Sequence, residues 1–353
     1  MLDLSKNEVH GVIGRPAADS SSARRNALLI VAGAALLASA VAVRNRAQEA
    51  ERDNPPLGSF IDVEGVRLHY LERGQGQPLV LLHGDGSMIH DFALSGLIDL
   101  AAQKYRVIAF DRPGYGYSER PRTTVWTPQA QAELLHFALH RLGIERPIVL
   151  GHSWGTLVAI SLALQAPEYV KSLVLLSGYY YPTARLDVPL LSPPAIPVIG
   201  DLLRYTISPL LGRMIWPAMR RRLFSPAPVP QKFMDEFPVW MSLRPSQLRA
   251  SAGDAAMMIP AAYALHDRYR DLTMPVVIVA GDSDRHADMH VHSAALHEDI
   301  PHSTLHVIHG AGHMIHHVAP DAVMNAIDEA AQAARAERRV TGPAAFPTAV
   351  QPA

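Results

Sequence analysis

Cysteine is absent from the 353-residue sequence, and this absence removes several kinds of chemistry at once. Without thiols the chain forms no disulfide, no thiolate metal site and no cysteine nucleophile. An excess of charge of either sign is also lacking, because 32 basic residues nearly balance 33 acidic ones and leave a formal net charge of −1. A chain this close to neutral has no electrostatic reason to bind nucleic acid. The composition therefore predicts no nucleic-acid partner.

Charged residues are few as well, at 18% of the chain against 48% for apolar residues. Such a composition is typical of a globular protein with a sizeable core. The length allows either one large α/β domain with insertions or two domains.

One long apolar run lies near the N-terminus. Residues 27–43 are 17 consecutive uncharged residues with arginines on both sides. As a helix the run spans roughly 25 Å, enough to cross the apolar core of a bilayer. We interpret it as a membrane anchor; the alternatives are an export signal cleaved near Ala38-Ser39-Ala40 and a buried helix of a soluble enzyme. Residues 1–26 are expected to be a disordered tail and residues 44–58 a linker.

Short apolar runs predict the strands of a buried parallel sheet. A hairpin over residues 59–70 precedes them, and segments of helical composition separate them. Strands that alternate with helices indicate an α/β fold with a mostly parallel sheet flanked by helices. The core is expected over residues 59–181 and 272–337, with a disordered tail at 338–353. The predicted strands are residues 78–82, 105–110, 148–150, 172–176, 276–280 and 304–308.

The alternation of strands and helices stops between residues 182 and 271. This segment has no clear strand and contains 13 prolines with short amphipathic pieces between them. We interpret it as a helical cap inserted into the α/β core. The alternative is a partly disordered insertion, which the leucine, methionine, tryptophan and tyrosine content disfavours.

The stretch from Pro147 to Gly155 carries the first catalytic signal. The apolar run ends in Gly151-His152-Ser153-Trp154-Gly155, and an alanine- and leucine-rich segment over residues 156–165 follows. Strand, G-x-S-x-G and helix is the order of a nucleophile elbow, a sharp turn that exposes a serine hydroxyl. The flanking glycines leave room for that turn. Ser153 is therefore the candidate nucleophile.

A serine hydroxyl needs a base to remove its proton, and a histidine in a glycine-rich loop follows the last predicted strand. The loop reads Gly310-Ala311-Gly312-His313. The small glycines allow an imidazole to approach the serine, and this setting favours His313 over the nearby His316 and His317. His313 is the candidate general base and acid.

An orienting carboxylate is expected between the serine and the histidine in the chain. Asp282 and Asp284 both follow the predicted strand 276–280. The distance from the strand end favours Asp284, and Asp282 is expected to be solvated or to bond within the turn. Both candidate loops leave carboxyl ends of strands, where α/β sheets place ligands.

An oxyanion hole needs two backbone N–H groups aimed at the developing charge. We expect one from Trp154, directly after the nucleophile, and one from Asp85 in the loop after the strand 78–82. Trp154, Tyr179 and Tyr180 are candidate substrate contacts, although core packing explains the tyrosines equally well. His286, His290 and His292 have metal-like spacing without a carboxylate to complete a set, so no metal and no cofactor is predicted.

Together these motifs resemble the α/β-hydrolase-fold family over about residues 58–334. The resemblance implies a parallel sheet with an inserted helical cap and a triad of Ser153, His313 and Asp284. Haloalkane dehalogenases and epoxide hydrolases also carry tryptophan after the nucleophile, but their nucleophile is an aspartate, so Ser153 argues against both chemistries. The resemblance rests on His83-Gly84, residues 111–118, Gly151–Gly155, Gly281–Asp284 and Gly310–His313.

The resemblance implies a serine hydrolase that cleaves a carboxylic ester, or a related acyl compound, through an acyl-enzyme on Ser153. An acyltransferase, a carbon–carbon bond hydrolase and a perhydrolase use the same triad and remain alternatives. An aminopeptidase would need an acidic site in the cap to bind the substrate amine. Asp235-Glu236 is the only adjacent acidic pair there, so the sequence disfavours this alternative. From another class, the fold can serve as a ligand-binding protein without turnover.

The anchor interpretation places the protein in a bacterial inner membrane, held by residues 27–43, with its catalytic domain exported. Cleavage of the run would instead make it periplasmic or secreted. The expected partner is a small acyl substrate, and the sequence does not define an oligomeric state.

Overall fold

The computed structural model describes residues 20–185 and 188–341. The outer parts of the two predicted tails, residues 1–19 and 342–353, lie outside the described residues. The inner parts differ from the prediction of disorder: residues 20–26 belong to helix α1 (Ser20–Asp53) and residues 338–341 to helix α14 (Pro320–Thr341). Their polar composition predicted loose chain, but each segment continues a neighbouring helix.

Eight strands form one sheet in the order β1-β2-β4-β3-β5-β6-β7-β8. The pairs β1–β2 and β2–β4 are antiparallel, and every pair from β4 to β8 is parallel. This confirms the predicted α/β fold with a mostly parallel sheet. The strands are β1 (Ser59–Val63), β2 (Val66–Arg73), β3 (Gln77–Leu82), β4 (Tyr105–Phe110), β5 (Ile148–His152), β6 (Ser172–Leu176), β7 (Val276–Gly281) and β8 (Thr304–Ile308).

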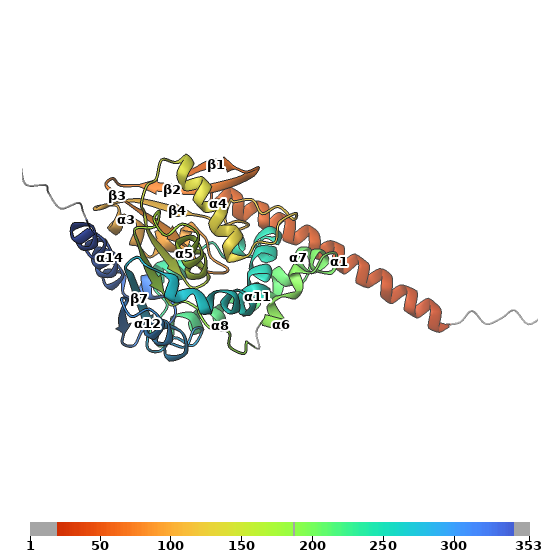
Figure 1. Ribbon diagram of the computed structural model, residues 1–353. Helices are drawn as coiled ribbons and strands as arrows, with labels where there is room; N and C mark the ends of the chain where they lie inside the picture. The colour runs from red at the N-terminus through yellow and green to blue at the C-terminus, as the bar shows by residue number, and fades with distance from the viewer. Residues whose placement is uncertain (1–19, 186–187, 342–353) are drawn as a thin grey trace, which may run out of the picture.

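Helices cover both faces of the sheet (Figure 1). α4 and α5 pack with one apolar cluster on one face, and α3 and α14 pack with a second cluster on the other. α4 (Pro128–Arg141) begins where Thr127 caps it by accepting a hydrogen bond from the Ala130 N–H and Pro128 follows at the first position. Besides α14, the core helices are α2 (Ile89–Leu94), α3 (Leu97–Ala101), α4 (Pro128–Arg141), α5 (Trp154–Gln165), the short π-helix η3 (His290–Ala294), α12 (Ala295–Asp299) and α13 (Ile315–Val318).

Between β6 and β7, the described residues 182–185 and 188–271 contain helices joined by loops and no strand. We call residues 182–271 the cap. Its two long helices, α8 and α11, each carry a proline inside the helix, Pro217 and Pro260. The cap elements are α6 (Val188–Leu191), η1 (Pro193–Ala195), α7 (Ile199–Tyr205), α8 (Ser208–Phe224), α9 (Gln231–Glu236), α10 (Val239–Ser242), α11 (Pro245–Leu265) and η2 (His266–Asp271).

Helix α1 is long and apolar enough, by length and composition, to cross a membrane. Its first half projects away from the rest of the protein, and its second half lies along the cap (Figure 1). The side chains of Val43 and Ala50 are buried at this contact. The Ser39 hydroxyl donates a hydrogen bond of 2.8 Å to the carbonyl of Thr206, at the end of α7.

The predicted linker over residues 44–58 is wrong for residues 44–53, which continue α1. Its charged residues predicted an exposed linker, but they form ion pairs on the helix and with the cap. Arg46 pairs with Glu49 at 2.7 Å, and Glu51 pairs with Arg244 of the cap at 2.8 Å. The helix therefore reaches the domain directly.

Candidate active site

Ser153 lies at the sharp turn between β5 and α5. Its backbone has φ 52° and ψ −120°, a conformation that residues other than glycine rarely adopt. The turn is packed so closely that a Cβ atom on Gly155 would lie 2.1 Å from the Leu82 carbonyl oxygen, and one on Gly151 would lie 2.5 Å from the Gly155 oxygen. The two glycines are therefore required, as the elbow pattern predicted.

His313 and Asp284 form a buried pair. The Nδ1 atom of His313 lies 2.8 Å from Oδ2 of Asp284, and both side chains are almost fully shielded from solvent. The other carboxylate oxygen accepts hydrogen bonds from the backbone N–H groups of His286 and Ala287, at 2.7 and 3.0 Å. This carboxylate is thus held by three donors.

The surroundings of Asp284 favour its charged form. Burial by itself would raise the pKa of Asp284, but the charge and hydrogen bond of His313 and the two backbone N–H groups lower this pKa to about 2. A carboxylate that stays ionised fixes the His313 ring with Nδ1 as the donor. The opposite ring nitrogen is then free to accept a proton.

The loop of His313 meets the elbow through the residue before the serine. Nε2 of His152 lies 3.0 Å from the His313 carbonyl oxygen, and the two ring centroids are 5.0 Å apart. The backbone N–H of His313 also donates to the carbonyl of Leu223 in the cap, at 2.9 Å. The structure therefore brings together the elbow, the histidine loop and the cap.

Asp282, the alternative acid, faces away from this pair. It contacts His309 at 3.0 Å and accepts the N–H of Gly310 at 2.9 Å. The hydrogen bonds of His309, Ser283 and Gly310 lower the pKa of Asp282. Asp282 thus accepts one hydrogen bond within its own turn, from the Ser283 hydroxyl at 2.9 Å, and its other two contacts join this turn to the loop after β8.

The loop after β3 lies against the nucleophile. A Cβ atom on Gly84 would lie 3.1 Å from Cβ of Ser153, so only a glycine fits there without displacement. Asp85 follows Gly84 in the chain and Trp154 follows Ser153, so the two candidate N–H groups come directly after the residues in this contact. The Trp154 N–H lies in the first turn of α5, where N–H groups have no acceptor within the helix.

The Asp85 carboxylate is turned toward the cap. It accepts a hydrogen bond of 2.7 Å from the Tyr115 hydroxyl and another from Ser251 of α11. Burial and the nearby charge of Asp254 raise the pKa of Asp85, against these two hydrogen bonds, which lower it. A higher pKa favours the neutral form, which reduces its repulsion of a nearby anion.

The side chains of Trp154, Tyr179 and Tyr180 lie in the apolar cluster between the sheet and α4, α5 and α11. All three are buried. Core packing, one of the two interpretations open for the tyrosines, accounts for these positions, and substrate contact by the three side chains stays a prediction.

A buried charged network between core and cap was not predicted. The guanidinium of Arg112 donates to the carbonyl groups of His83 and Gly84 and pairs with Asp254 of α11 at 2.8 Å. Asp254 also pairs with Arg120 at 2.9 Å and accepts the Tyr115 hydroxyl at 2.9 Å. Arg112 stands in the Asp-Arg-Pro-Gly motif, but the sequence gives no sign of its partner 142 residues later.

A second group of buried histidines was also missed. Asp91 lies 3.1 Å from Nε2 of His316 and 2.7 Å from Nε2 of His317, and His152 lies beside His316. Asp91, His152 and His316 are close enough to share a metal ion. The Nε2 atoms of His152 and His316 contact the His313 carbonyl and Asp91, whereas the Nδ1 atoms of both rings are buried without a hydrogen-bond partner.

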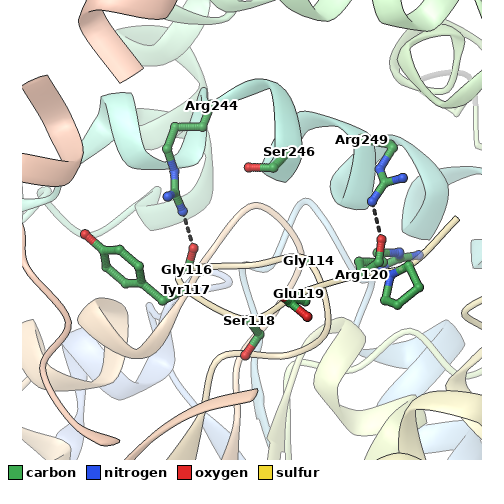
Figure 2. Close-up of a pocket in the computed structure, with 10 residues that line it drawn as sticks. Gly114, Gly116, Tyr117, Ser118, Glu119, Arg120, Arg244, Ser246 and Arg249 are labelled. Atoms are coloured by element: carbon green, nitrogen blue, oxygen red, sulfur yellow. Dashed lines mark hydrogen bonds between the residues drawn. The ribbon is translucent and has the colours of Figure 1, made fainter. Parts of the chain in front are cut away.

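A cavity of about 430 Å³ opens between the loop at residues 114–121 and the start of α11. Figure 2 shows Arg244 and Arg249 of the cap bonded to the carbonyl groups of Gly116 and Arg120. Among the described residues, its lining contains none of Ser153, Asp284 and His313.

The family model of the alpha/beta hydrolase fold matches residues 77–320 of the chain. An uncharacterized hydrolase of Bacillus subtilis, YugF, is 27% identical over 278 residues, which cover 76% of this chain and 95% of that protein. The residues that the family model matches include the elbow, both loops of the His313–Asp284 pair and the whole cap.

Solved structures share the fold. An esterase from Thermogutta terrifontis superposes with a TM-score of 0.62 at 22% identity, over 78% of this chain and 99% of the other. A membrane phospholipase A superposes with a TM-score of 0.60 at 21% identity, over 90% of this chain and 99% of the other. With the family model matched across the core and the cap, the chain belongs to the alpha/beta hydrolase fold family, whose relatives include hydrolases.

Proposed function

We propose that the protein is a serine hydrolase that cleaves a carboxylic ester through an acyl-enzyme on Ser153. The observation that carries this proposal is the buried His313–Asp284 pair, 2.8 Å apart, whose loop contacts His152, the residue before Ser153 in the nucleophile elbow. A histidine that is oriented by an ionised carboxylate is the base that a serine hydroxyl requires.

In the proposed reaction the Ser153 oxygen attacks the ester carbonyl and its proton passes to Nε2 of His313. Asp284 keeps the Nδ1–H of that ring in place and stabilises the imidazolium. The N–H groups of Asp85 and Trp154 bind the oxyanion, and His313 then gives the proton to the departing alcohol. Water repeats the sequence on the acyl-enzyme and releases the carboxylic acid.

The substrate class we propose is a lipophilic ester, because α1 is apolar enough to hold the domain at a membrane. In this proposal α1 is a membrane anchor with the catalytic domain exported, and a cleaved signal is the alternative. The likeness to a membrane phospholipase A, over 90% of this chain, is compatible with a lipid ester. Acyl transfer to an acceptor other than water would use the same groups.

The test is hydrolysis of p-nitrophenyl esters from acetate to palmitate by the full chain in detergent micelles. We expect turnover in the wild type and a loss of roughly 10⁴- to 10⁶-fold in Ser153→Ala. Ser161→Ala is the matched control, because Ser161 is a buried serine in α5, the helix that follows Ser153, and its substitution should leave turnover unchanged.

A fluorophosphonate probe separates the remaining outcomes. Labelling of the wild type without hydrolysis of any ester would keep the nucleophile and reject simple esters as substrates. If the wild type shows neither labelling nor turnover, the enzyme proposal is rejected in favour of a ligand-binding protein.

A further inference from the structure

Exposed apolar side chains are concentrated in one part of the cap. Among the described residues, 25 large apolar side chains are exposed, of which 13 lie between Leu190 and Met219 and 6 lie in α1. Val198 is 79% exposed and Met214 is 71% exposed. Soluble proteins seldom expose apolar side chains in such a group, and a contiguous patch marks a surface that meets another apolar phase.

The arrangement on α8 shows that this exposure follows a helical face. Exposed apolar residues recur every four positions along α8 and form one stripe. They are Leu210 and Met214 in one series and Leu211, Ile215 and Met219 in the next. The other side of the helix is apolar as well, because Trp216 and Phe224 pack there against Phe233 and Phe237 of the cap. The outward stripe is therefore additional to the residues that pack α8 onto the protein.

Charge is nearly absent from the same segment. Residues 188–219 contain one carboxylate, Asp201, and two arginines, Arg204 and Arg213. Asp201 is paired with Arg122 at 2.6 Å and also with Arg204, so its charge is compensated within the protein. Arg220, Arg221 and Arg222 follow at the end of α8, where basic side chains reach the headgroup level of an interfacial helix.

The exposed face adjoins the apolar part of α1. The hydrogen bond from Ser39 to the Thr206 carbonyl joins α1 to the end of α7 at the point where α1 leaves the domain. In Figure 1, α7 lies beside this part of α1, and the preceding part of α1 projects beyond it. A bilayer that surrounds the projecting half of α1 would meet the α6–α8 face first.

We propose that the α6–α8 face of the cap is inserted into the lipid bilayer beside α1. We call the exposed apolar side chains between Leu190 and Met219 the lipid face. It lies at the headgroup and upper acyl level, the depth of an interfacial amphipathic helix. The inference rests on α1 as the membrane anchor, but it is independent of the catalytic proposal.

Because the chain has no cysteine, single-cysteine variants can report depth without background labelling. The full chain is reconstituted into vesicles of phosphatidylethanolamine and phosphatidylglycerol that contain a lipid-attached nitroxide. An environment-sensitive fluorophore is placed at Val198→Cys, Leu202→Cys or Met214→Cys. Leu29→Cys on α1 is the positive control, and Phe137→Cys and Val291→Cys, exposed apolar positions outside the cap, are the negative controls.

We expect the nitroxide to quench the three cap probes several-fold more than the two negative controls. Cap probes that behave like Phe137→Cys and Val291→Cys, while Leu29→Cys is quenched, would overturn the lipid face and leave the anchor intact. Cap probes that the lipid nitroxide does not quench, and that are shielded from water only by a second labelled copy of the chain, would overturn the lipid face in favour of self-association. No quenching at Leu29→Cys would overturn the anchor and the inference together, whatever the enzyme assay shows.

Discussion

Apolar side chains have opposite positions in the sheet and in the cap. In β3 the residues Leu79–Leu82 are completely buried, and the neighbouring parallel strands are built in the same way. On α7 the side chain of Leu202 is 54% exposed, and much of the segment around it is equally apolar and open. The sheet thus hides its apolar residues from water, whereas the cap presents many of its own outward.

Polar side chains show the reverse arrangement. Asp254 on α11 is fully buried, and it points into the core to pair with Arg112 and Arg120. Gln247 of the same helix is buried too, and it accepts the N–H of Gly116 at 3.0 Å. The cap therefore attaches to the sheet through buried polar groups and leaves apolar groups outside, which is the distribution that the proposed lipid face requires.

The largest effect on stability is expected where the two regions meet. Replacement Asp254→Asn leaves the charges of Arg112 and Arg120 buried without their partner, which should lower the free energy of unfolding by about 3–5 kcal/mol. Denaturant unfolding of the full chain in detergent measures this loss. Asp201→Asn removes a cap carboxylate that also pairs with two arginines but lies at the surface, and its effect should be much smaller. Equal effects would contradict a cap that is held by buried charge.

The next effect concerns the carboxylate at the active site. The pKa of Asp284 is lowered to about 2 in the folded protein, against 3.8 for a free side chain. A lowered pKa stabilises the fold above the unfolded value, so a contribution on the order of 2 kcal/mol should be complete above pH 4 and lost as the pH falls from about 4 to 2. Unfolding followed across this range measures the loss.

The variant Asp284→Asn should lack this part of the acid dependence. Asp282→Asn, which changes an exposed carboxylate two residues away, should keep it. Parallel acid profiles for the wild type and Asp284→Asn would show that the buried pair with His313 does not stabilise the fold through its charge.

The same contrast explains what the sequence could predict. A strand that is buried on both faces is a continuous apolar run, so the parallel strands β3 to β7 were located from composition alone, whereas β8 at the sheet edge is partly exposed. The elbow was located because its backbone admits only glycine at residues 151 and 155. These features depend on local chemistry.

The missed features depend on contacts between distant segments. Arg112 and Asp254 are partners only in the folded chain, and the charged end of α1 is ordered by its ion pair with Arg244 of the cap. The lipid face was hidden for another reason: a helix that is apolar on two sides has the same composition as one that is buried. Exposure, which separates the two, is a property of the tertiary structure.

The smallest effect is expected for truncation of a leucine in the exposed part of the cap, and it tests the comparison most directly when the same truncation is made in the sheet. Leu79→Ala in β3 should lower the free energy of unfolding in detergent by about 2–5 kcal/mol, because it removes packed methyl groups and leaves a cavity. Leu202→Ala on α7 removes the same atoms from an exposed position and should change it by less than about 0.5 kcal/mol. If Leu202→Ala cost as much as Leu79→Ala, the Leu202 side chain would be packed against protein in solution, and the face around it would have no surface left to offer to lipid.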